Sequence, residues 1–380
     1  MHLINSFALG GAETVAVDLA VRMDKETFEV FVCSIGRRND DIERAIRGEL
    51  LSKDIVTLSL DKPPRRGRVR AIWKLYRFLS ENRIDIVHTH CPSPDFYGKV
   101  AAFLARTPVV LSTIQNVQGY SPFAERILKH LTSKYVALSE TVRRYAISDL
   151  LIPPEKVEVI YNAVDLKRFG RTATDRGAKL LELGISGASE IVSLTGRITE
   201  QKGHVYAIEA AEDVLREFPA THFLMVGDQD ADPELSGQLK ELVRAKALQD
   251  KVTFTGVRQD FPEILAVTDI FIQPSLWEGL SIALLAAMAT GIPVVVTDVG
   301  SNAEFIDDGE NGLVIPAGDA QMLARRIKEL LADRERARRL GMRAKATVRQ
   351  RFSIQHTIRA YEHLYLGFAQ EMDHYSEVTL

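Results

Sequence analysis

Two cations, Arg197 and Lys202, stand in the short segment 196–203, which has the sequence Gly-Arg-Ile-Thr-Glu-Gln-Lys-Gly. This segment follows an apolar run and precedes a helical pattern. A guanidinium and an ammonium beside a helix N-terminus can neutralise a diphosphate without a metal ion. The segment lacks the Gly-Lys-Ser/Thr ending of a P-loop, so it does not predict that type of nucleotide hydrolysis. The alternative is a pair of ordinary solvated surface charges.

A carboxylate, Glu278, follows a second apolar run, and Gly279, Leu280 and Ser281 come directly after it. The carboxylate can hold sugar hydroxyls, while the amides that open the next, apolar helix can face phosphate oxygens. The alternative is an acid that only stabilises the dipole of its own helix. Taken alone, the pattern favours neither reading.

A glycine pair, Gly10 and Gly11, separates the first apolar run from a helical pattern. Paired glycines let backbone amides approach a phosphate or a sugar, although Gly-Gly also marks a simple tight turn. The segment is not the Gly-x-Gly-x-x-Gly fingerprint of dinucleotide binding, which disfavours a nicotinamide dehydrogenase.

Strands rich in Val and Ile alternate with helical stretches, which is typical of parallel sheets covered by helices. The fold class is therefore α/β, with two doubly wound, Rossmann-like domains. Ligands of such sheets bind beyond the carboxyl ends of the strands, so we expect a central cleft between two facing domains. We expect strands at 3–7, 28–35, 54–60, 85–90, 109–114, 135–139, 157–162, 191–196, 222–227, 252–256, 270–274, 293–298 and 313–316.

The domain boundary is predicted in the stretch 165–187, which is rich in charge and glycine. The chain then divides into an N-terminal domain, 1–165, a C-terminal domain, 166–353, and a terminal helix, 354–380, that can cross back onto the first domain.

The composition describes a globular chain of 380 residues with 46% hydrophobic residues and a net charge of −3. This near-neutral balance argues against a dedicated nucleic-acid binder. Two cysteines cannot form a disulfide framework, so we expect a reducing, cytoplasmic compartment. Neither a secretory signal nor an apolar run long enough to span a bilayer is visible.

Read together, the motifs resemble those of the family-4 glycosyltransferases over nearly the whole chain. The resemblance is carried by Gly-Gly-Ala-Glu at 10–13, Asp-Ile-Val-His-Thr-His at 85–90, Ile-Tyr-Asn-Ala-Val-Asp at 160–165, the segment 196–203, Val-Gly-Asp at 226–228, Glu-Gly at 278–279 and Gly-Ile-Pro-Val-Val at 291–295.

The resemblance implies the GT-B fold, a UDP- or GDP-linked sugar donor held mainly by the second domain, and an acceptor held by the first. It also implies retention of anomeric configuration without a metal ion or other cofactor. By the same resemblance, Arg197 and Lys202 neutralise the donor diphosphate and Glu278 contacts the donor sugar. The donor-binding positions that it implies are Gly10, Gly11, Gly196, Gly227, Asp228, Gly279, Leu280, Ser281 and Ala286.

Two positions depart from the family pattern. Ala286 stands where the family has a second Glu that holds the nucleotide ribose, and alanine cannot accept those hydrogen bonds. Gln115, followed by Asn116, stands where the family commonly has a His near the donor sugar, and an amide cannot change charge near pH 7. Together with His90, these two residues are predicted to lie on the acceptor or sugar side.

Two possible metal motifs are weak in sequence. His88 and His90 point to the same face of a strand, but no third ligand follows at a convincing spacing, which favours a structural or acceptor-side role. The run Asp228-Gln229-Asp230 stands where the family has a Gly-Asp-Gly loop, so a turn near the nucleotide is expected there in place of a metal site.

The segment 62–83 carries eight Lys and Arg residues and a single acid, Glu81, interleaved with apolar residues. A basic amphipathic helix of this kind can rest on an anionic membrane surface, which is consistent with a lipid-linked acceptor. The alternative is a helix whose apolar side simply faces the core.

These patterns predict a hexosyltransferase that acts on a glycan or lipid-linked acceptor in cell-surface polysaccharide synthesis, either in the cytoplasm or peripherally at the inner membrane face. Ala286 keeps open a catalytically impaired protein that binds nucleotide sugars or regulates a partner. A nucleotide-sugar epimerase is disfavoured because no second acid/base pair is found near the sugar.

Overall fold

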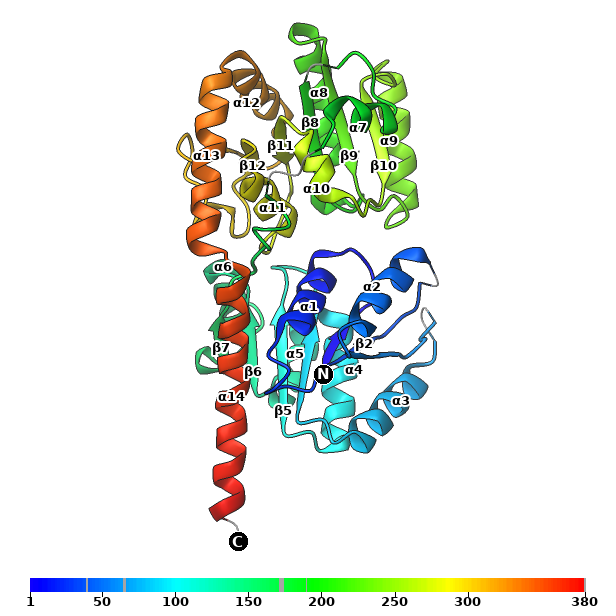
Figure 1. Ribbon diagram of the computed structural model, residues 1–380, viewed down its shortest axis with the longest axis vertical. Coiled ribbons are helices and arrows are strands. Elements are labelled where there is room, and N and C mark those ends of the chain that lie inside the picture. The colour runs from blue at the N-terminus through cyan, green and yellow to red at the C-terminus, as the bar shows by residue number, and fades with distance from the viewer. Residues whose placement is uncertain (39, 64–65, 171–173, 189, 379–380) are drawn as a thin grey trace. The chain divides into compact units, whose positions relative to one another are not determined.

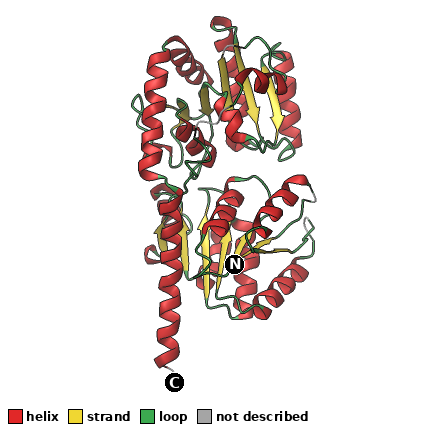
Figure 2. Cartoon of the chain, in the orientation of Figure 1, coloured by secondary structure: helices red, strands yellow, loops and turns green. Residues whose placement is uncertain are grey.

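The computed structural model describes residues 1–38, 40–63, 66–170, 174–188 and 190–378, with the side chains of 372–378 left out. Within this range the chain forms two compact units (Figure 1). The first contains Met1–Asn162 and Gln355–Leu380, and the second contains Ala163–Ile354. Each unit is a parallel sheet with helices on both of its faces (Figure 2).

The first unit is built on a 7-stranded sheet with the order β3-β2-β1-β4-β5-β6-β7. The strands are β1 (His2–Ile4), β2 (Phe31–Ser34), β3 (Val56–Ser59), β4 (Ile86–His90), β5 (Val109–Ile114), β6 (Lys134–Ala137) and β7 (Val157–Val159). The helices are α1 (Gly11–Arg22), α2 (Asp41–Leu51), α3 (Arg68–Glu81), α4 (Pro92–Ala105), α5 (Pro122–Leu128), α6 (Glu140–Ser148) and most of α14 (Ile354–Val378).

The second unit has a 6-stranded sheet with the order β10-β9-β8-β11-β12-β13. The strands are β8 (Glu190–Thr195), β9 (Thr221–Val226), β10 (Val252–Gly256), β11 (Ile270–Gln273), β12 (Val294–Thr297) and β13 (Leu313–Ile315). The helices are α7 (Arg176–Glu182), α8 (His204–Glu217), α9 (Pro233–Ala245), α10 (Phe261–Ala266), α11 (Ile282–Thr290), α12 (Ala320–Ala332) and α13 (Arg334–Arg351).

The predicted fold class is confirmed, because both sheets are parallel and both reverse their strand order at an interior point, as in doubly wound folds. The apolar stripe of α8 explains how a helix is fixed onto such a sheet. Ile208 and Ala211 are fully buried, and Val205 and Leu215 pack against the same core. In the described residues no helix is long and apolar enough to cross a membrane.

Candidate active site

The strand order of the second sheet reverses between β8 and β11, and the two segments singled out in the sequence follow these two neighbouring strands. Residues 196–203 connect β8 to α8, and residues 274–281 connect β11 to α11. A reversal point opens a crevice at the carboxyl ends of the strands, where α/β proteins bind ligands. Chain topology therefore brings both segments to one edge.

Lys202 and Glu278 form an ion pair at this edge, with 2.5 Å between Nζ and Oε1. The Glu278 side chain is only 5% exposed and that of Lys202 16%, so water screens the pair weakly. The Ser275 hydroxyl donates to the same carboxylate oxygen at 2.8 Å. The carboxylate is thus held in one orientation, and it in turn holds the ammonium.

Gln201 ties the two segments together. Its backbone carbonyl accepts a hydrogen bond from the amide of Leu276 at 2.8 Å. Its side-chain amide donates to the carbonyl of Trp277 at 3.0 Å and lies 3.4 Å from Glu278 Oε2. The sequence analysis did not select Gln201, because an amide between charged residues carries no pattern of its own.

Two glycines permit the close approach of the loops. Gly203 has a φ of +66°, and a Cβ there would lie 2.0 Å from the carbonyl oxygen of Pro274. Gly227 has a φ of +150°, and a Cβ there would lie 1.9 Å from the carbonyl oxygen of Gly196. Any other residue would push the loops after β8, β9 and β11 apart.

The remaining predicted donor-binding residues of this unit lie around the same edge. Arg197 is exposed, and within the described part of the chain it forms no ion pair. Asp228 follows β9, and its carbonyl accepts from the amide of Ile198 at 2.9 Å. Gly279 and Leu280 precede α11, and Ser281 caps this helix by accepting from the amide of Leu284 at 3.3 Å.

Ala286 lies within α11 and is completely buried. A glutamate at this position would place a carboxylate where the chain now has a methyl group, and a buried carboxylate needs hydrogen-bonding partners. Ala286 thus contributes a buried methyl group, and no side-chain hydrogen-bonding atom, to α11.

Several buried polar atoms at this edge have no partner among the described residues. They include atoms of Thr195 at the end of β8, Gln273 at the end of β11, and His204, whose two ring nitrogens are both unpaired. Burial, followed by the nearby charge of Lys202, lowers the pKa of His204 to about 4. Such unsatisfied groups are rare in folded proteins and are expected where a polar ligand binds. Sequence reasoning missed all three, because only their shared location makes them notable.

In the first unit the predicted residues follow β1, β4 and β5, which are neighbours at the reversal point of that sheet. Gly10 is the N-cap of α1, which begins at Gly11. Asn116 Oδ1 accepts from the amide of Val117 at 2.8 Å, whereas the side-chain nitrogen of Gln115 is buried without a described partner. These residues belong to a different unit from Lys202 and Glu278.

The structure places a third histidine, His2, beside His88 and His90, a neighbour that the spacing of the two histidines in the sequence does not reveal. His2 on β1 is the register partner of His88 on β4, and its Nδ1 lies 3.1 Å from Nε2 of His90. The signal was available, because in a doubly wound sheet the first strand pairs with the fourth. Burial lowers the pKa of all three histidines, that of His90 to about 3, so they are uncharged at pH 7.

Two Rossmann-like domains, each with polar residues at its reversal point, define the GT-B architecture, and comparisons with known proteins agree. The family model "Glycosyltransferase Family 4" matches residues 9–168, and "Glycosyl transferases group 1" matches residues 178–347. The chain belongs to the family-4 glycosyltransferases.

Two curated relatives illustrate the range of the family. The chain is 28% identical over 326 residues to an Escherichia coli UDP-Gal:alpha-D-GlcNAc-diphosphoundecaprenol alpha-1,3-galactosyltransferase, covering 82% of each. It is 26% identical to the N-acetyl-alpha-D-glucosaminyl L-malate synthase of Bacillus anthracis, covering 77% of each.

Among solved structures, Anabaena HepE in complex with UDP and glucose has a TM-score of 0.83 at 21% identity, with 97% of this chain and 100% of that chain covered. That likeness concerns the fold.

Proposed function

We propose that this chain is a retaining hexosyltransferase that moves a sugar from a UDP- or GDP-linked donor to a glycan or lipid-linked acceptor. The observation that carries the proposal is the Lys202–Glu278 pair at the reversal point of the second sheet. Transfer from a nucleoside diphosphate sugar is favoured by a cation beside the leaving diphosphate and a polar group beside the sugar, and this pair can provide both.

In the proposed reaction, cleavage of the anomeric bond moves negative charge onto the leaving nucleoside diphosphate. Lys202, Arg197 and the amides at the start of α11 stabilise this charge, which makes a catalytic metal unnecessary. Glu278 contacts the sugar hydroxyls and keeps Lys202 in place before the donor arrives. Charges that are oriented in advance cost little reorganisation at the transition state.

A panel of donors tests this proposal. Incubation with UDP- and GDP-linked hexoses, with and without a chelator, should give donor hydrolysis or transfer with one nucleotide, at a rate that chelation leaves unchanged. The anomeric configuration of the product is read by NMR. An inverted product, or activity that disappears with the chelator, would contradict the corresponding part of the proposal.

We place the acceptor on a polyprenyl diphosphate and the enzyme at the cytoplasmic membrane face, in the synthesis of a cell-surface polysaccharide. The support is the activity for which the Escherichia coli relative is named, because that protein acts on a diphosphoundecaprenol-linked sugar. A chain with such an acceptor must meet a membrane surface.

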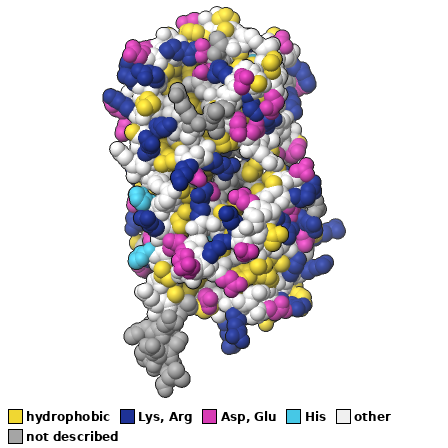
Figure 3. Space-filling model, viewed as in Figure 1, with side chains coloured by type: hydrophobic (Ala, Val, Ile, Leu, Met, Phe, Trp, Pro, Cys, Tyr) yellow, Lys and Arg dark blue, Asp and Glu magenta, His cyan; other side chains and the backbone are white. Residues whose placement is uncertain are grey.

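The helix α3 is the proposed contact, with Pro64 and Arg65 of the basic segment outside the described residues. Ala71, Leu75 and Leu79 face the core, which accounts for part of the apolar pattern. Val69 and Trp73 do not, because they are 82% and 56% exposed. Lys and Arg side chains project along this edge of the first unit (Figure 3).

Flotation with anionic vesicles tests the membrane contact. At low salt the chain should float, and replacing Val69 and Trp73 together by Ser should abolish flotation. The matched control is Leu181→Ser in the second unit, which removes a side chain that is 73% exposed. Equal flotation of both variants, or none by the unaltered chain, would contradict the contact.

A second candidate is a protein that binds nucleotide sugars without efficient turnover. It is favoured by Ala286, which cannot hold the ribose. Donor binding detected by calorimetry, combined with the absence of hydrolysis and transfer over the whole donor panel, would select this candidate.

A further inference from the structure

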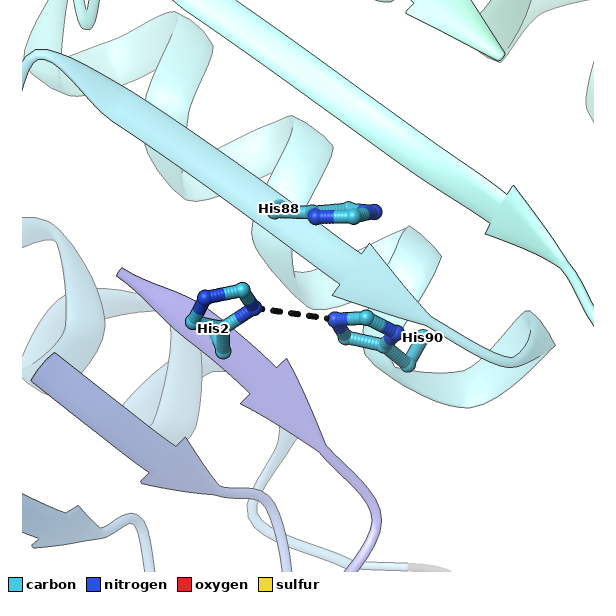
Figure 4. A group of neighbouring side chains, drawn as sticks. All are labelled: His2, His88 and His90. Carbon is cyan, nitrogen blue, oxygen red and sulfur yellow. Dashed lines mark hydrogen bonds between the residues drawn. The ribbon is translucent and has the colours of Figure 1, made fainter. Parts of the chain in front are cut away.

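Three histidines converge inside the first unit. His2 comes from β1, and His88 and His90 come from the neighbouring strand β4 (Figure 4). Side chains two residues apart on a strand share a face, and register pairing puts His2 on that face too. The three residues are buried, with relative exposures of 3%, 1% and 0%.

The spacing of the rings fits one metal ion. One nitrogen from each ring can be chosen so that all three lie within 4.8 Å of one another. A tetrahedral zinc ion with bonds of about 2.0–2.1 Å separates its ligand atoms by about 3.3 Å. The pair His2 Nδ1 and His90 Nε2, at 3.1 Å, is already near that value. His88 has to approach by at most about 1.5 Å, which a side-chain rotation can provide.

The surroundings supply the outer contacts that metal-binding histidines usually have. The two ring nitrogens of His88 lie 2.5 Å from the Tyr365 hydroxyl and 2.6 Å from the Thr113 hydroxyl. Whichever nitrogen binds the ion, the other keeps a hydroxyl that fixes the ring.

His90 offers a further sign of an incomplete site, because its Nδ1 is buried without a partner among the described residues. The hydroxyl of Tyr361 is unpaired in the same way, and its ring centroid lies 5.5 Å from that of His88. Buried polar atoms without partners are costly, so such atoms indicate that a further polar group is missing in this part of the unit.

An entry route is present. A cavity of about 230 Å³ in the first unit is lined by His2, His88 and Tyr365, among other residues. An ion can therefore reach the rings without unfolding the sheet.

We propose that the first unit binds one divalent transition-metal ion, of the zinc type, through His2, His88 and His90. Imidazole nitrogens select zinc, cobalt, nickel or copper over magnesium or calcium. The ion would join β1 to β4 and, through Tyr365, to α14. The proposal does not depend on the donor or the acceptor, and it gives the ion no role in the transfer step.

The experiment uses the untagged full chain, stripped with a chelator and titrated with Co²⁺. We expect one ion per chain and the strong visible absorption of a four-coordinate site. Zn²⁺ should displace the Co²⁺ and raise the thermal unfolding midpoint, whereas Mg²⁺ should do neither. The X-ray absorption fine structure of the zinc-loaded chain should show a first shell with three imidazoles, a result that requires no variant.

His2→Asn and His90→Asn should abolish the cobalt spectrum and the zinc-dependent shift. The matched control is His222→Asn, which alters a buried histidine on β9 that lies outside the cluster and should leave both signals intact. The absence of stoichiometric binding, a first shell of water or carboxylate oxygens, or a spectrum unchanged in the folded His2→Asn variant would overturn the proposal.

Discussion

Buried polar groups differ between two regions of the molecule. One region is a polar network around α4 in the first unit. The other is the carboxyl ends of β8 and β11 in the second unit, called here the β8–β11 edge. In the network, the ammonium of Lys99 lies 3.4 Å from Asp95 and 3.3 Å from Glu125, with all three side chains at most 4% exposed. Tyr135 donates to Glu125 at 2.7 Å, and the Ser112 hydroxyl lies 2.7 and 2.8 Å from the two Asp95 oxygens. Every charge has a partner.

The β8–β11 edge of the second unit is incomplete by comparison. Buried polar atoms without described partners occur there on His204, Gln273 and Thr195. The Lys202–Glu278 ion pair lies at the same edge, and Lys202 can contact a ligand as well as Glu278. Buried polar residues of the same types therefore serve different purposes in the two regions. A closed network fixes a fold, whereas an open one binds something.

The largest effect is expected from Lys99→Met. This change leaves two buried carboxylates without their cation, and breaking a buried pair in this way costs about 3–5 kcal/mol of unfolding free energy. Burial already raises the pKa of Asp95. Urea unfolding measures the loss.

The matched control for Lys99→Met is Lys134→Met, which breaks a partly exposed pair with Glu158 at 3.9 Å. Its expected cost is under about 1 kcal/mol. If both variants lose equally little, the network is not a closed structural unit.

Next in size is Lys202→Ala, which should lower turnover at saturating donor about 100- to 1,000-fold, because a preoriented charge beside the leaving group is lost. Arg197→Ala tests the exposed cation of the segment 196–203, and it should change the free energy of unfolding little. Steady-state kinetics measures both variants.

Lys246→Ala, which breaks a pair with Glu212 elsewhere in the unit, should turn over normally. A Lys202→Ala enzyme of near-normal turnover would remove this residue from the reaction.

The third prediction concerns acid sensitivity. His204 is buried and uncharged, with a pKa of about 4 in the folded chain against an ordinary value of 6.5. As the pH falls, His204 therefore takes up a proton in the unfolded chain before it does so in the folded chain. The free energy of unfolding is highest above pH 6.5 and falls as the pH drops towards 4. His204 alone accounts for a loss of about 3 kcal/mol over this range.

Urea unfolding between pH 7.5 and 4 compares the unaltered chain with His204→Gln. The variant should show a shallower decline over this window. Two curves of identical slope would mean that His204 is solvated, and the edge would then be less enclosed than described.

The smallest effect is expected from Ala286→Glu, which should tighten donor nucleotide binding about 10- to 150-fold, since a carboxylate–hydroxyl pair contributes about 1.5–3 kcal/mol. Calorimetry with UDP and GDP measures it. Ala289→Glu, also in the buried part of α11, is the matched control and should only destabilise the chain. Unchanged affinity in a folded Ala286→Glu variant would contradict the ribose assignment.

The strands were predictable because a strand buried on both faces is a continuous apolar run. Val109–Ile114 and Val252–Gly256 have the predicted limits, whereas the first strand is His2–Ile4 where 3–7 was expected. Strand ends depend on hydrogen bonds to neighbouring strands, which an apolar run does not specify. The motif loops fall at the strand ends because turns are marked by glycine.

The contacts that join distant segments were not predictable in the same way. Lys99 and Asp95 are spaced for one face of a helix, but Glu125 and Tyr135 reach them only through tertiary packing. The partnership of His2 with His90 likewise depends on strand order. Gln201, His204 and Gln273 carry no spacing pattern, so only their burial at the carboxyl ends of β8 and β11 identifies them.

A crystal of the protein soaked with UDP would show directly whether the nucleotide binds at the carboxyl ends of β8 and β11. Diphosphate oxygens are expected within hydrogen-bonding distance of Lys202 Nζ and of the backbone amides at 279–281. A nucleotide bound away from this edge, or one whose diphosphate is held by a coordinated divalent ion in place of Lys202, would contradict it.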